Sequence, residues 1–414
     1  MSSVPPPLRS LEVFMARSGR RDVLCLRDPQ GFNPGTIALA PSAGMVLQLL
    51  DGRHSLRDIQ TEIARQTGEI VPLETLEKFV AQLDEALLLD SPRFATHRAQ
   101  ELQRYRQAPA RPAAHAGHSY PKTAAAIRKT FTQHFQPPSG PGTNGVQAPL
   151  PQALIIPHID LRCGGPTFAW AYAQLGHEPA VDTFLIWGVA HTPTENRFVA
   201  TRKDFETPLG VLRADQEFLD ELAQRVPFDL FADELAHRRE HSIEFQVVYL
   251  QYMLAEPERY RIVPILTGSF HDLMEAGKDP MRDPQVTAFV KALRETIRKC
   301  GRRVCVLASV DLAHVGGRFG DRFTVNDEVR RQLEVEDRRM LSLVEACDAE
   351  AFLRFIYDEQ DERRVDAWPT LYTLLRTGRF SDGQLLRYDQ NYEPDTNSVV
   401  TFASLRLDGG DGGR

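Results

Sequence analysis

Histidine and aspartate side chains stand directly after three apolar runs in the second half of the sequence. They are His158 after ALIIP, His191 after TFLIWGVA, and Asp311 and His314 after CVLASV. Only 12 of the 414 residues are histidines, so random placement would rarely put one after each of three runs. Ligands of open α/β sheets bind outside the carboxyl ends of the strands. We therefore expect these side chains to share one site.

A fourth segment, EHSIEFQ, adds Glu240, His241 and Glu244 at the start of a predicted helix. Imidazole and carboxylate groups suit Fe(II), Zn(II), Mn(II) or Cu(II), and histidines with one carboxylate and open positions serve oxygen activation or Lewis-acid catalysis. A histidine that binds no metal can act as an acid or a base, because its pKa lies near neutrality. The sequence has no G-x-S-x-G, G-x-x-x-x-G-K-[ST] or G-x-G-x-x-G motif, so serine-hydrolase, P-loop and nicotinamide sites have no support.

The elements that must position these residues are predicted from the alternation of apolar and amphipathic segments. From residue 151 on, short apolar runs such as TFLIWGV and YRIVPILTG are separated by segments with helical spacing, such as SIEFQVVYLQYML. Continuous apolar strands between helices are typical of a buried parallel sheet. We predict an α/β domain over residues 151–405, with a central, mainly parallel sheet and helices on both faces.

The first 150 residues have a different organisation. Residues 1–92 predict a small, mostly helical domain with one short strand, in which Ser55 is a helix N-cap and Gly68 ends that helix. Residues 93–150 are rich in Pro, Ala and Gly and predict a linker with a helical insert, TAAAIRKTFTQHF. Residues 406–414 predict a flexible tail.

Composition narrows the class of protein. The net charge of −7 argues against nucleic-acid binding, and no apolar run approaches the roughly 20 residues that span a bilayer. The N-terminus lacks a secretory signal, and the five cysteines are scattered without a CxxC pair. This usage fits a reducing compartment. We expect a cytoplasmic protein without nucleic-acid or membrane partners.

Six motifs in order resemble the Memo proteins, called AmmeMemoRadiSam system protein B in prokaryotes. They are IPHIDLRCGGPTFAWAY, WGVAHTPT, ETPLGVLRAD, EHSIEFQVVYLQ, IVPILTG and SVDLAHVGGRFG. That family is similar to class III extradiol dioxygenases, which hold non-haem iron. The resemblance implies that His158 and His191 are metal ligands, and that Asp311, His314, His241 and Glu244 are the catalytic residues. LLDGRHSLRDI in the N-terminal part resembles PqqD-like modules, which accompany radical-SAM enzymes.

The sequence departs from the family pattern at two positions of the site. Thr192 replaces the second histidine of an SHH pair, and Val365 aligns with the family's ligand cysteine. Asp366, one residue further on, is the candidate third metal ligand. It precedes Trp368-Pro369, so the alternatives are a solvated loop residue or the N-cap of the helix AWPTLYTLLR. The set predicts Fe(II) or Cu rather than Mg, since magnesium prefers oxygen ligands.

Two functions remain open at this point. One is a metal-dependent, dioxygenase-like redox enzyme that acts on a small phenolic or peptide substrate. The other is a non-catalytic peptide- or protein-binding scaffold of a radical-SAM-associated system, with radical-SAM and AMMECR-type proteins as partners. The retained histidines favour the enzyme, and the lost cysteine favours the scaffold.

Overall fold

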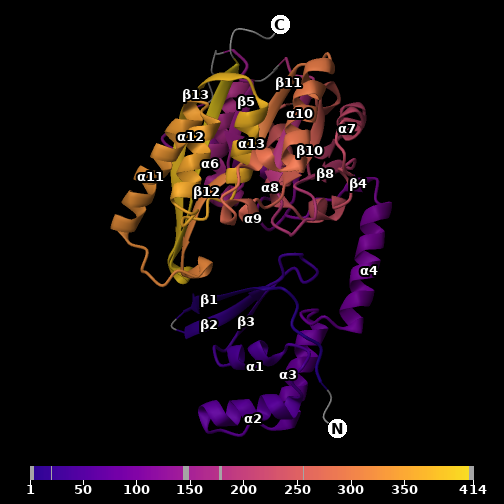
Figure 1. Ribbon diagram of the computed structural model, residues 1–414, viewed down its shortest axis with the longest axis vertical. Coiled ribbons are helices and arrows are strands. Elements are labelled where there is room, and N and C mark those ends of the chain that lie inside the picture. Colours follow the sequence, from indigo (N-terminus) through magenta and orange to yellow (C-terminus); the bar gives the residue numbers. More distant parts are fainter. Residues whose placement is uncertain (1–3, 20, 143–148, 177–179, 255, 410–414) are drawn as a thin grey trace. The chain divides into compact units, whose positions relative to one another are not determined.

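The structure, a computed structural model, describes residues 4–19, 21–142, 149–176, 180–254 and 256–409 (Figure 1). Contacts between residues divide the chain into two compact units. Unit 1 comprises Met1–Ala108, Gly316–Thr324 and Glu393–Ser398; unit 2 comprises Pro109–Val315, Val325–Tyr392 and Val399–Arg414. The first boundary, after Ala108, lies inside the stretch 93–150 that the composition predicts as a linker.

Unit 1 contains a small antiparallel sheet in the order β1-β2-β3, and the helices of the unit follow this sheet along the chain. Its elements are β1 (Glu12–Ser18), β2 (Arg21–Arg27), β3 (Thr36–Leu39), α1 (Ala43–Leu49), α2 (Leu56–Thr67), α3 (Leu73–Glu85) and α4 (Pro92–Gln107). Helix α2 starts with a capping box between Ser55 and Asp58 and ends at Gly68 in a left-handed conformation. Apolar side chains of β2 and of α1 to α3 form the core of the unit.

Two features of unit 1 differ from the sequence expectation. Strands β1 and β2 pair along their whole length, whereas the sequence predicted only one strand in this part of the chain. Strand β1 was missed because its sequence, EVFMARS, lacks the strict alternation of apolar and polar residues that marks a half-buried strand. The predicted linker begins with helix α4. Ser91 accepts a hydrogen bond from the N–H of Phe94, and Pro92 occupies the first helical turn, so the local sequence starts a helix there.

Unit 2 is built on a large sheet in the order β12-β14-β5-β11-β6-β10-β7, and β13 pairs with β14. Its strands are β5 (Ala153–Ile156), β6 (Thr183–Val189), β7 (Phe198–Ala200), β10 (Arg261–Thr267), β11 (Val304–Ser309), β12 (Asp311–Gly316), β13 (Phe380–Glu393) and β14 (Ser398–Gly409). Strands β5, β11, β6 and β10 are parallel to their neighbours in this central part. Strands β7 and β14, at either side of it, are antiparallel to β10 and β5. The sheet is therefore parallel at its centre and mixed as a whole.

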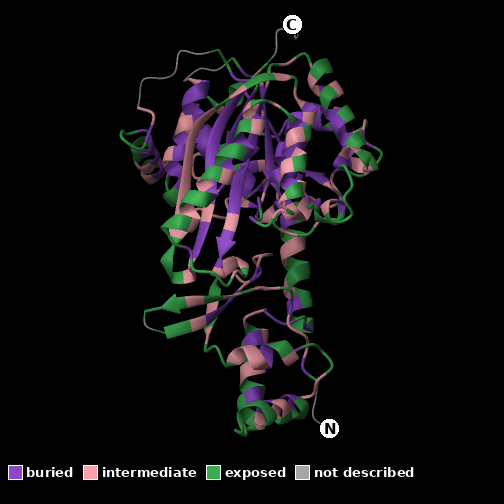
Figure 2. Ribbon diagram, turned by 60° about the vertical axis from the view of Figure 1, so that its left-hand side comes forward, coloured by how far each residue is buried: buried purple, intermediate pink, exposed green. Residues whose placement is uncertain are grey.

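Helices cover both faces of this sheet, which confirms the predicted α/β fold. The helices of unit 2 are α5 (Ala124–His134), α6 (Leu161–Tyr172), α7 (Gln216–Ala223), α8 (His241–Met253), α9 (His271–Glu275), α10 (Pro284–Lys299), α11 (Asp327–Glu345), α12 (Ala349–Asp358) and α13 (Trp368–Thr377). Alternate residues of β6 pack into different cores: Leu185 and Trp187 lie with side chains of α7 and α10 to α13, and Phe184 and Ile186 with those of α5, α6 and α8. Figure 2 shows the strands buried between these layers.

The edges of unit 2 add elements that the apolar pattern did not predict. A small sheet joins β4 (Ala110–Arg111), β8 (Asp204–Thr207) and β9 (Gly210–Leu212). Strand β14 continues to Gly409, past the predicted domain end at 405, because Arg406 and Leu407 pair with β5. The rest of the predicted tail, residues 410–414, lies outside the described residues. None of the described helices is long and apolar enough to cross a membrane.

Candidate metal centre

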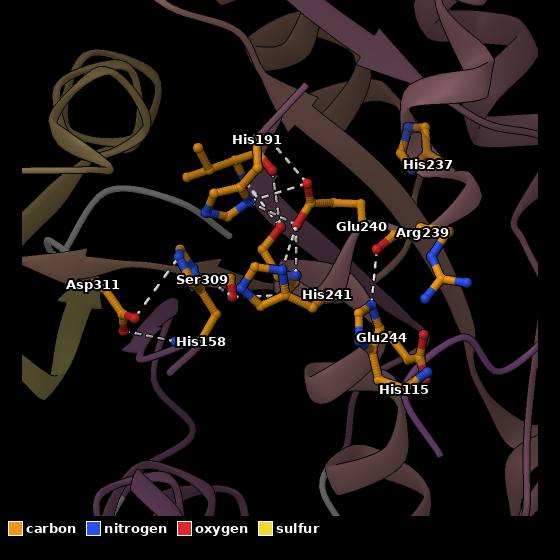
Figure 3. A network of polar contacts seen from close by, with 12 residues as sticks. His115, His158, His191, His237, Arg239, Glu240, His241, Glu244, Ser309 and Asp311 are labelled. Carbon is orange, nitrogen blue, oxygen red and sulfur yellow. Dashed lines mark hydrogen bonds and ion pairs between the residues drawn. The ribbon is translucent and has the colours of Figure 1, made fainter. Parts of the chain in front are cut away.

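Three histidine rings lie together where parallel strands of unit 2 end (Figure 3). His158 follows β5, His191 follows β6, and His241 is the first residue of α8. The ring centres are 5.2 Å apart for His158 and His191, 5.4 Å for His158 and His241, and 4.5 Å for the stacked pair His191 and His241. One ligand atom from each ring lies within 4.8 Å of the others, so the three imidazoles could hold a metal ion.

The first turn of α8 is fixed to the ends of the strands by hydrogen bonds. Ser242 Oγ donates to the carbonyl of Val189 at 3.0 Å and accepts from its N–H at 3.1 Å. Gly188 permits this approach, because a Cβ there would lie 2.4 Å from Ser242 Oγ. One turn further, the Gln246 amide donates to the carbonyl of Pro157 at 2.8 Å and to a serine hydroxyl at the end of β11. Helix α8 thus connects the ends of β5, β6 and β11.

Asp366 brings a carboxylate to two of the imidazoles. Its Oδ2 is 3.0 Å from His158 Nε2, and its Oδ1 is 3.7 Å from His191 Nε2. The side chain is 19% exposed, so it is not a solvated loop residue. It also does not cap α13, whose N-cap is Ala367 without a side-chain hydrogen bond. Asp366 is thus neither a solvated loop residue nor a helix N-cap, and its carboxylate faces the imidazoles.

The atoms of this cluster fit a metal ion. His158 Nε2 and Asp366 Oδ2 are buried and lie 3.0 Å apart, as an ion pair when His158 carries a proton on Nε2. Two donors on one ion, each at about 2.1 Å, are at most about 4.2 Å apart. The distances from Asp366 to His158 and His191 meet that limit. Buried polar atoms need a partner, and a metal ion between them would satisfy these two in place of the proton.

Glu240 orients two of the histidines. Its carboxylate accepts a hydrogen bond from His191 Nδ1 at 2.9 Å and from the backbone N–H of His191 at 3.0 Å. It also caps α8 through the N–H of Ser242, and its Oε1 lies 3.3 Å from His241 Nδ1. A histidine that donates Nδ1–H to a carboxylate presents the lone pair of Nε2, which is the usual arrangement of a metal-ligating imidazole. Glu240 therefore prepares His191, and to a lesser degree His241, for metal binding.

The charges of the cluster are strongly coupled. Burial would lower the pKa of His191, but the carboxylates of Glu240 and Asp366 outweigh burial and raise it. Burial would raise the pKa of Asp366, but the charge of His191 and the contact with His158 lower it below its usual range. Burial and the charge of His191 lower the pKa of His241 well below its ordinary value, which keeps this ring neutral. The carboxylates favour positive charge at this point, which protonated imidazoles supply and which a divalent cation could replace.

Asp311 and His314 lie in β12, at the edge of this cluster. The Asp311 carboxylate accepts hydrogen bonds from the backbone N–H groups of His158 at 2.9 Å and Ile159 at 3.1 Å. Its Oδ2 is 3.9 Å from His158 Nε2. His314 Nδ1 is 3.0 Å from the carbonyl of Leu312. It does not belong to the group of three imidazoles, but its charge lowers the pKa of Asp366. The structure thus brings His241, rather than His314, to the pair formed by His158 and His191.

Glu244 has a different position from the one expected of a catalytic residue. Its side chain is fully buried, forms an ion pair with Arg111, and accepts a 2.5 Å hydrogen bond from the Tyr120 hydroxyl. Two backbone N–H groups, of Ala114 and His115, complete its partners at 3.0 and 2.9 Å. The carboxylate is directed to the chain segment before β5, where all of these partners lie, and not to the three imidazoles.

A cavity of about 380 Å³ adjoins the cluster at His191. It is lined by residues 190–197 together with Ser269 and Asp272. His191 is the open member of the pair, with 34% of its side chain exposed against 1% for His158. A molecule in this cavity would reach the cluster past His191. Its lining is rich in hydroxyl, amide and charged groups.

Two residues that support the cluster, Glu240 and Gln246, were given no role in the interpretation of the sequence. Glu240 stood before His241 in the motif EHSIE, and its acidic character at a helix start was the available signal. Gln246 gave no signal, because a polar residue in a helix is normally solvated, and only the packing of α8 shows that it spans two strand ends.

Together, these features define an α/β protein with imidazole and carboxylate groups gathered at the carboxyl ends of parallel strands. The family model described as Memo-like protein matches residues 111–406. A MEMO1 family protein of Aquifex aeolicus is 28% identical over 390 residues, which cover 93% of this chain and 96% of that protein. A MEMO1 family protein of Thermus thermophilus is 30% identical over 361 residues, covering 86% of this chain and 100% of that protein.

The chain belongs to the Memo-like protein family. A relative from Methanopyrus kandleri is 29% identical and aligns over 70% of this chain and 96% of its own length. The matched region of the family model contains the whole cluster, from His158 to Asp366. The alignment with the Aquifex protein extends well beyond that region, so it includes most of unit 1 as well.

Proposed function

We propose that this chain is a metal-dependent redox protein with dioxygenase-like chemistry, whose ion is held by His158, His191 and Asp366. The observation that carries this proposal is the approach of one carboxylate to two imidazoles: Asp366 Oδ2 lies 3.0 Å from His158 Nε2, and Asp366 Oδ1 lies 3.7 Å from His191 Nε2. Two histidines and one carboxylate with open positions are the ligand set of non-haem Fe(II) oxygenases. Fe(II) is therefore the favoured ion, and Cu is the alternative.

The other residues of the cluster have separate roles in this proposal. A bound redox metal would supply the activation of oxygen. His241 is a neutral imidazole beside His191 and offers a further donor or a proton acceptor. Asp311 orients His158 through the backbone and lies 3.9 Å from its Nε2, which makes it one acid–base candidate, and His314 is the second. Glu240 keeps the proton of His191 on Nδ1.

The substrate class follows from the cavity beside His191. Its mixed lining of hydroxyl, amide and charged groups suits a small molecule with several hydrogen-bonding groups, such as a phenolic compound with ring hydroxyls, or a polar peptide. A cytoplasmic location, and radical-SAM and AMMECR-type partner proteins, remain predictions from the sequence.

The test separates turnover from binding. The full chain is loaded with Fe(II) without oxygen, freed of excess metal, and mixed with oxygenated buffer that contains protocatechuate or catechol. We expect oxygen uptake that depends on the phenolic compound and that is lost in His158→Ala/His191→Ala. Absence of uptake by the loaded wild-type chain with both compounds would reject phenolic ring chemistry.

A second candidate, a non-catalytic scaffold, has one observation in its favour. Val365 stands where the resemblance to the family places a ligand cysteine, and it is a core residue with 1% exposure, so this position supplies no thiolate to the cluster. A scaffold would bind metal without oxygen uptake, and its affinity for peptides would not change when the metal is removed. Isothermal titration with peptide probes, before and after chelation, distinguishes the two candidates.

A further inference from the structure

The chain segment 109–120, which we call the strap, runs from the start of unit 2 to the first turn of α8. It contains β4, which pairs in parallel with β8. Two fully buried charged side chains, Arg111 on the strap and Glu244 on α8, form an ion pair. We propose that Arg111 and Glu244 are positioning residues of the metal centre: they set the place of the backbone that carries Glu240 and His241. This inference rests on the proposed metal site.

Arg111 acts on backbone carbonyl groups near the cluster. Its guanidinium donates to the carbonyl of Glu240 at 2.8 Å and to that of His237 at 2.9 Å. The guanidinium also lies over the ring of Phe205, 5.3 Å from its centre. The planar fork of an arginine fixes direction as well as distance. Because Glu240 precedes His241 and is the N-cap of α8, the arginine holds the residues that orient two of the imidazoles.

Glu244 holds the strap against α8. It accepts hydrogen bonds from the Tyr120 hydroxyl and from the N–H groups of Ala114 and His115, in addition to the ion pair with Arg111. The His115 ring then packs on His241, with 5.7 Å between ring centres, and His115 Nε2 is 2.8 Å from the carbonyl of Arg239. Figure 3 shows His241 between His191 and His115. The strap is therefore the support on the side of His241 away from His191.

Stability alone does not explain an ion pair at this place. Buried ion pairs contribute little net stability, because the cost of removing both charges from water offsets their attraction, and apolar pairs of similar volume often replace them without loss. What an apolar pair cannot reproduce is the set of directed hydrogen bonds to the Glu240 and His237 carbonyl groups. A positioning role predicts that metal binding and stability respond differently to such a replacement.

The experiment compares metal binding with folding in the full-length protein. Co(II) is titrated into metal-free wild type, Glu244→Gln, Arg111→Met and the apolar double variant Arg111→Met/Glu244→Leu, and its d–d absorption spectrum and affinity are recorded together with the melting temperature of each metal-free variant. We expect each variant to lose tenfold or more in affinity, the scale seen when supporting groups of metal sites are removed, and to show a changed spectrum. The double variant leaves neither charge unpaired, so we expect it to melt at a higher temperature than the single variants, but its affinity stays low because the hydrogen bonds to the Glu240 and His237 carbonyl groups are still absent.

Asp215→Asn is the matched control. Asp215 is a buried carboxylate of the same unit, paired with Arg302 and hydrogen-bonded to Thr183 at 2.8 Å. Thr183 begins β6, and His191 follows the other end of that strand. The control should lower the melting temperature and leave the Co(II) spectrum and affinity as in wild type.

Each outcome decides the question. A double variant with wild-type affinity and spectrum would overturn the positioning role and leave the metal site intact. Where the methionine and glutamine variants do not fold, Arg111→Lys carries the test, since lysine keeps the charge and loses the fork, and an unchanged Co(II) spectrum in that variant overturns the proposal. A wild-type chain that binds no Co(II) refutes the proposed metal site itself, and the positioning role with it.

Discussion

Asp366 supplies the only acidic side chain among the three proposed ligands, and its contribution can be measured directly. We expect Asp366→Asn to weaken Fe(II) or Co(II) binding roughly tenfold or more, because an amide lacks the negative charge and is a poorer ligand. Equilibrium titration measures the change. Asp160→Asn is the control. Asp160 is only two residues from His158 in the sequence, but its carboxylate caps α6 and forms an ion pair with Arg162. Equal affinities for wild type and Asp366→Asn would remove Asp366 from the site.

Individual residues of the site differed in how far the sequence could predict them. His158 and His191 stand out because each follows a continuous apolar strand, so chain position alone locates them at one sheet edge. The approach of Asp366 to His158 depends on the loop before α13, which no local pattern determines. Glu244 belongs to the same motif as His241 but faces the strap, where Arg111 and two backbone N–H groups hold its carboxylate, and the motif itself does not reveal these distant partners.

At the scale of elements, the contact between β6 and α8 aligns His191 with His241. Gly188→Ala would place a Cβ 2.4 Å from Ser242 Oγ and 3.0 Å from Ile243 Cγ1, so the helix start must move. We expect a loss of about 1–3 kcal/mol in the free energy of unfolding, the usual cost of overpacking, and weaker Co(II) binding. Chemical denaturation and metal titration measure the two effects.

Gly44→Ala serves as the control for this substitution. Gly44 lies in α1, and a Cβ there would be 3.6 Å from its nearest neighbour, Leu24 Cδ2, an ordinary contact. We expect a change within about 1 kcal/mol, because alanine is the better helix former, and normal metal binding. A Gly188→Ala protein with wild-type stability and affinity would show that the β6–α8 contact does not determine the geometry of the cluster.

The elements that apolar patterns predicted are those buried on both sides. Strands β5 and β6 are buried at every residue, and their runs of apolar letters reflect that. Strand β13 was missed because FSDGQLLRYDQNYE lies at the edge, is only partly buried, and carries polar side chains throughout. Strand β12 was not predicted, because Asp311 and His314 were expected to follow the strand that ends in CVLASV, whereas the structure places both in a further strand after the single residue Val310.

At the scale of the whole molecule, buried neutral histidines predict how stability depends on pH. Burial lowers the pKa of His134 to about 4, and its ring stacks on Phe131 with 5.2 Å between centres. Since the folded-state pKa is below the ordinary value of 6.5, the stabilising contribution is complete above about pH 6.5 and is lost as the pH falls toward 4. From pH 7 to pH 5 the loss amounts to about 2 kcal/mol.

His134→Phe isolates this contribution. Phenylalanine keeps the stack with Phe131 and Tyr249 but has no proton to gain. We expect the free energy of unfolding of the variant to fall less between pH 7 and pH 5 than that of the wild type, by about 2 kcal/mol. Urea denaturation at several pH values measures the difference. Parallel pH profiles for the two proteins would mean that His134 already accepts a proton in the folded state.

The metal content of the full chain tests the central claim most directly. The protein is loaded with Fe(II) without oxygen, passed over a desalting column, and measured by elemental analysis alongside His158→Ala/His191→Ala. We predict one ion per chain for the wild type and none retained by the double variant, because the variant keeps Asp366 and lacks the two imidazoles that lie beside it. Stoichiometric metal in the double variant, or none in the wild type, would contradict the account.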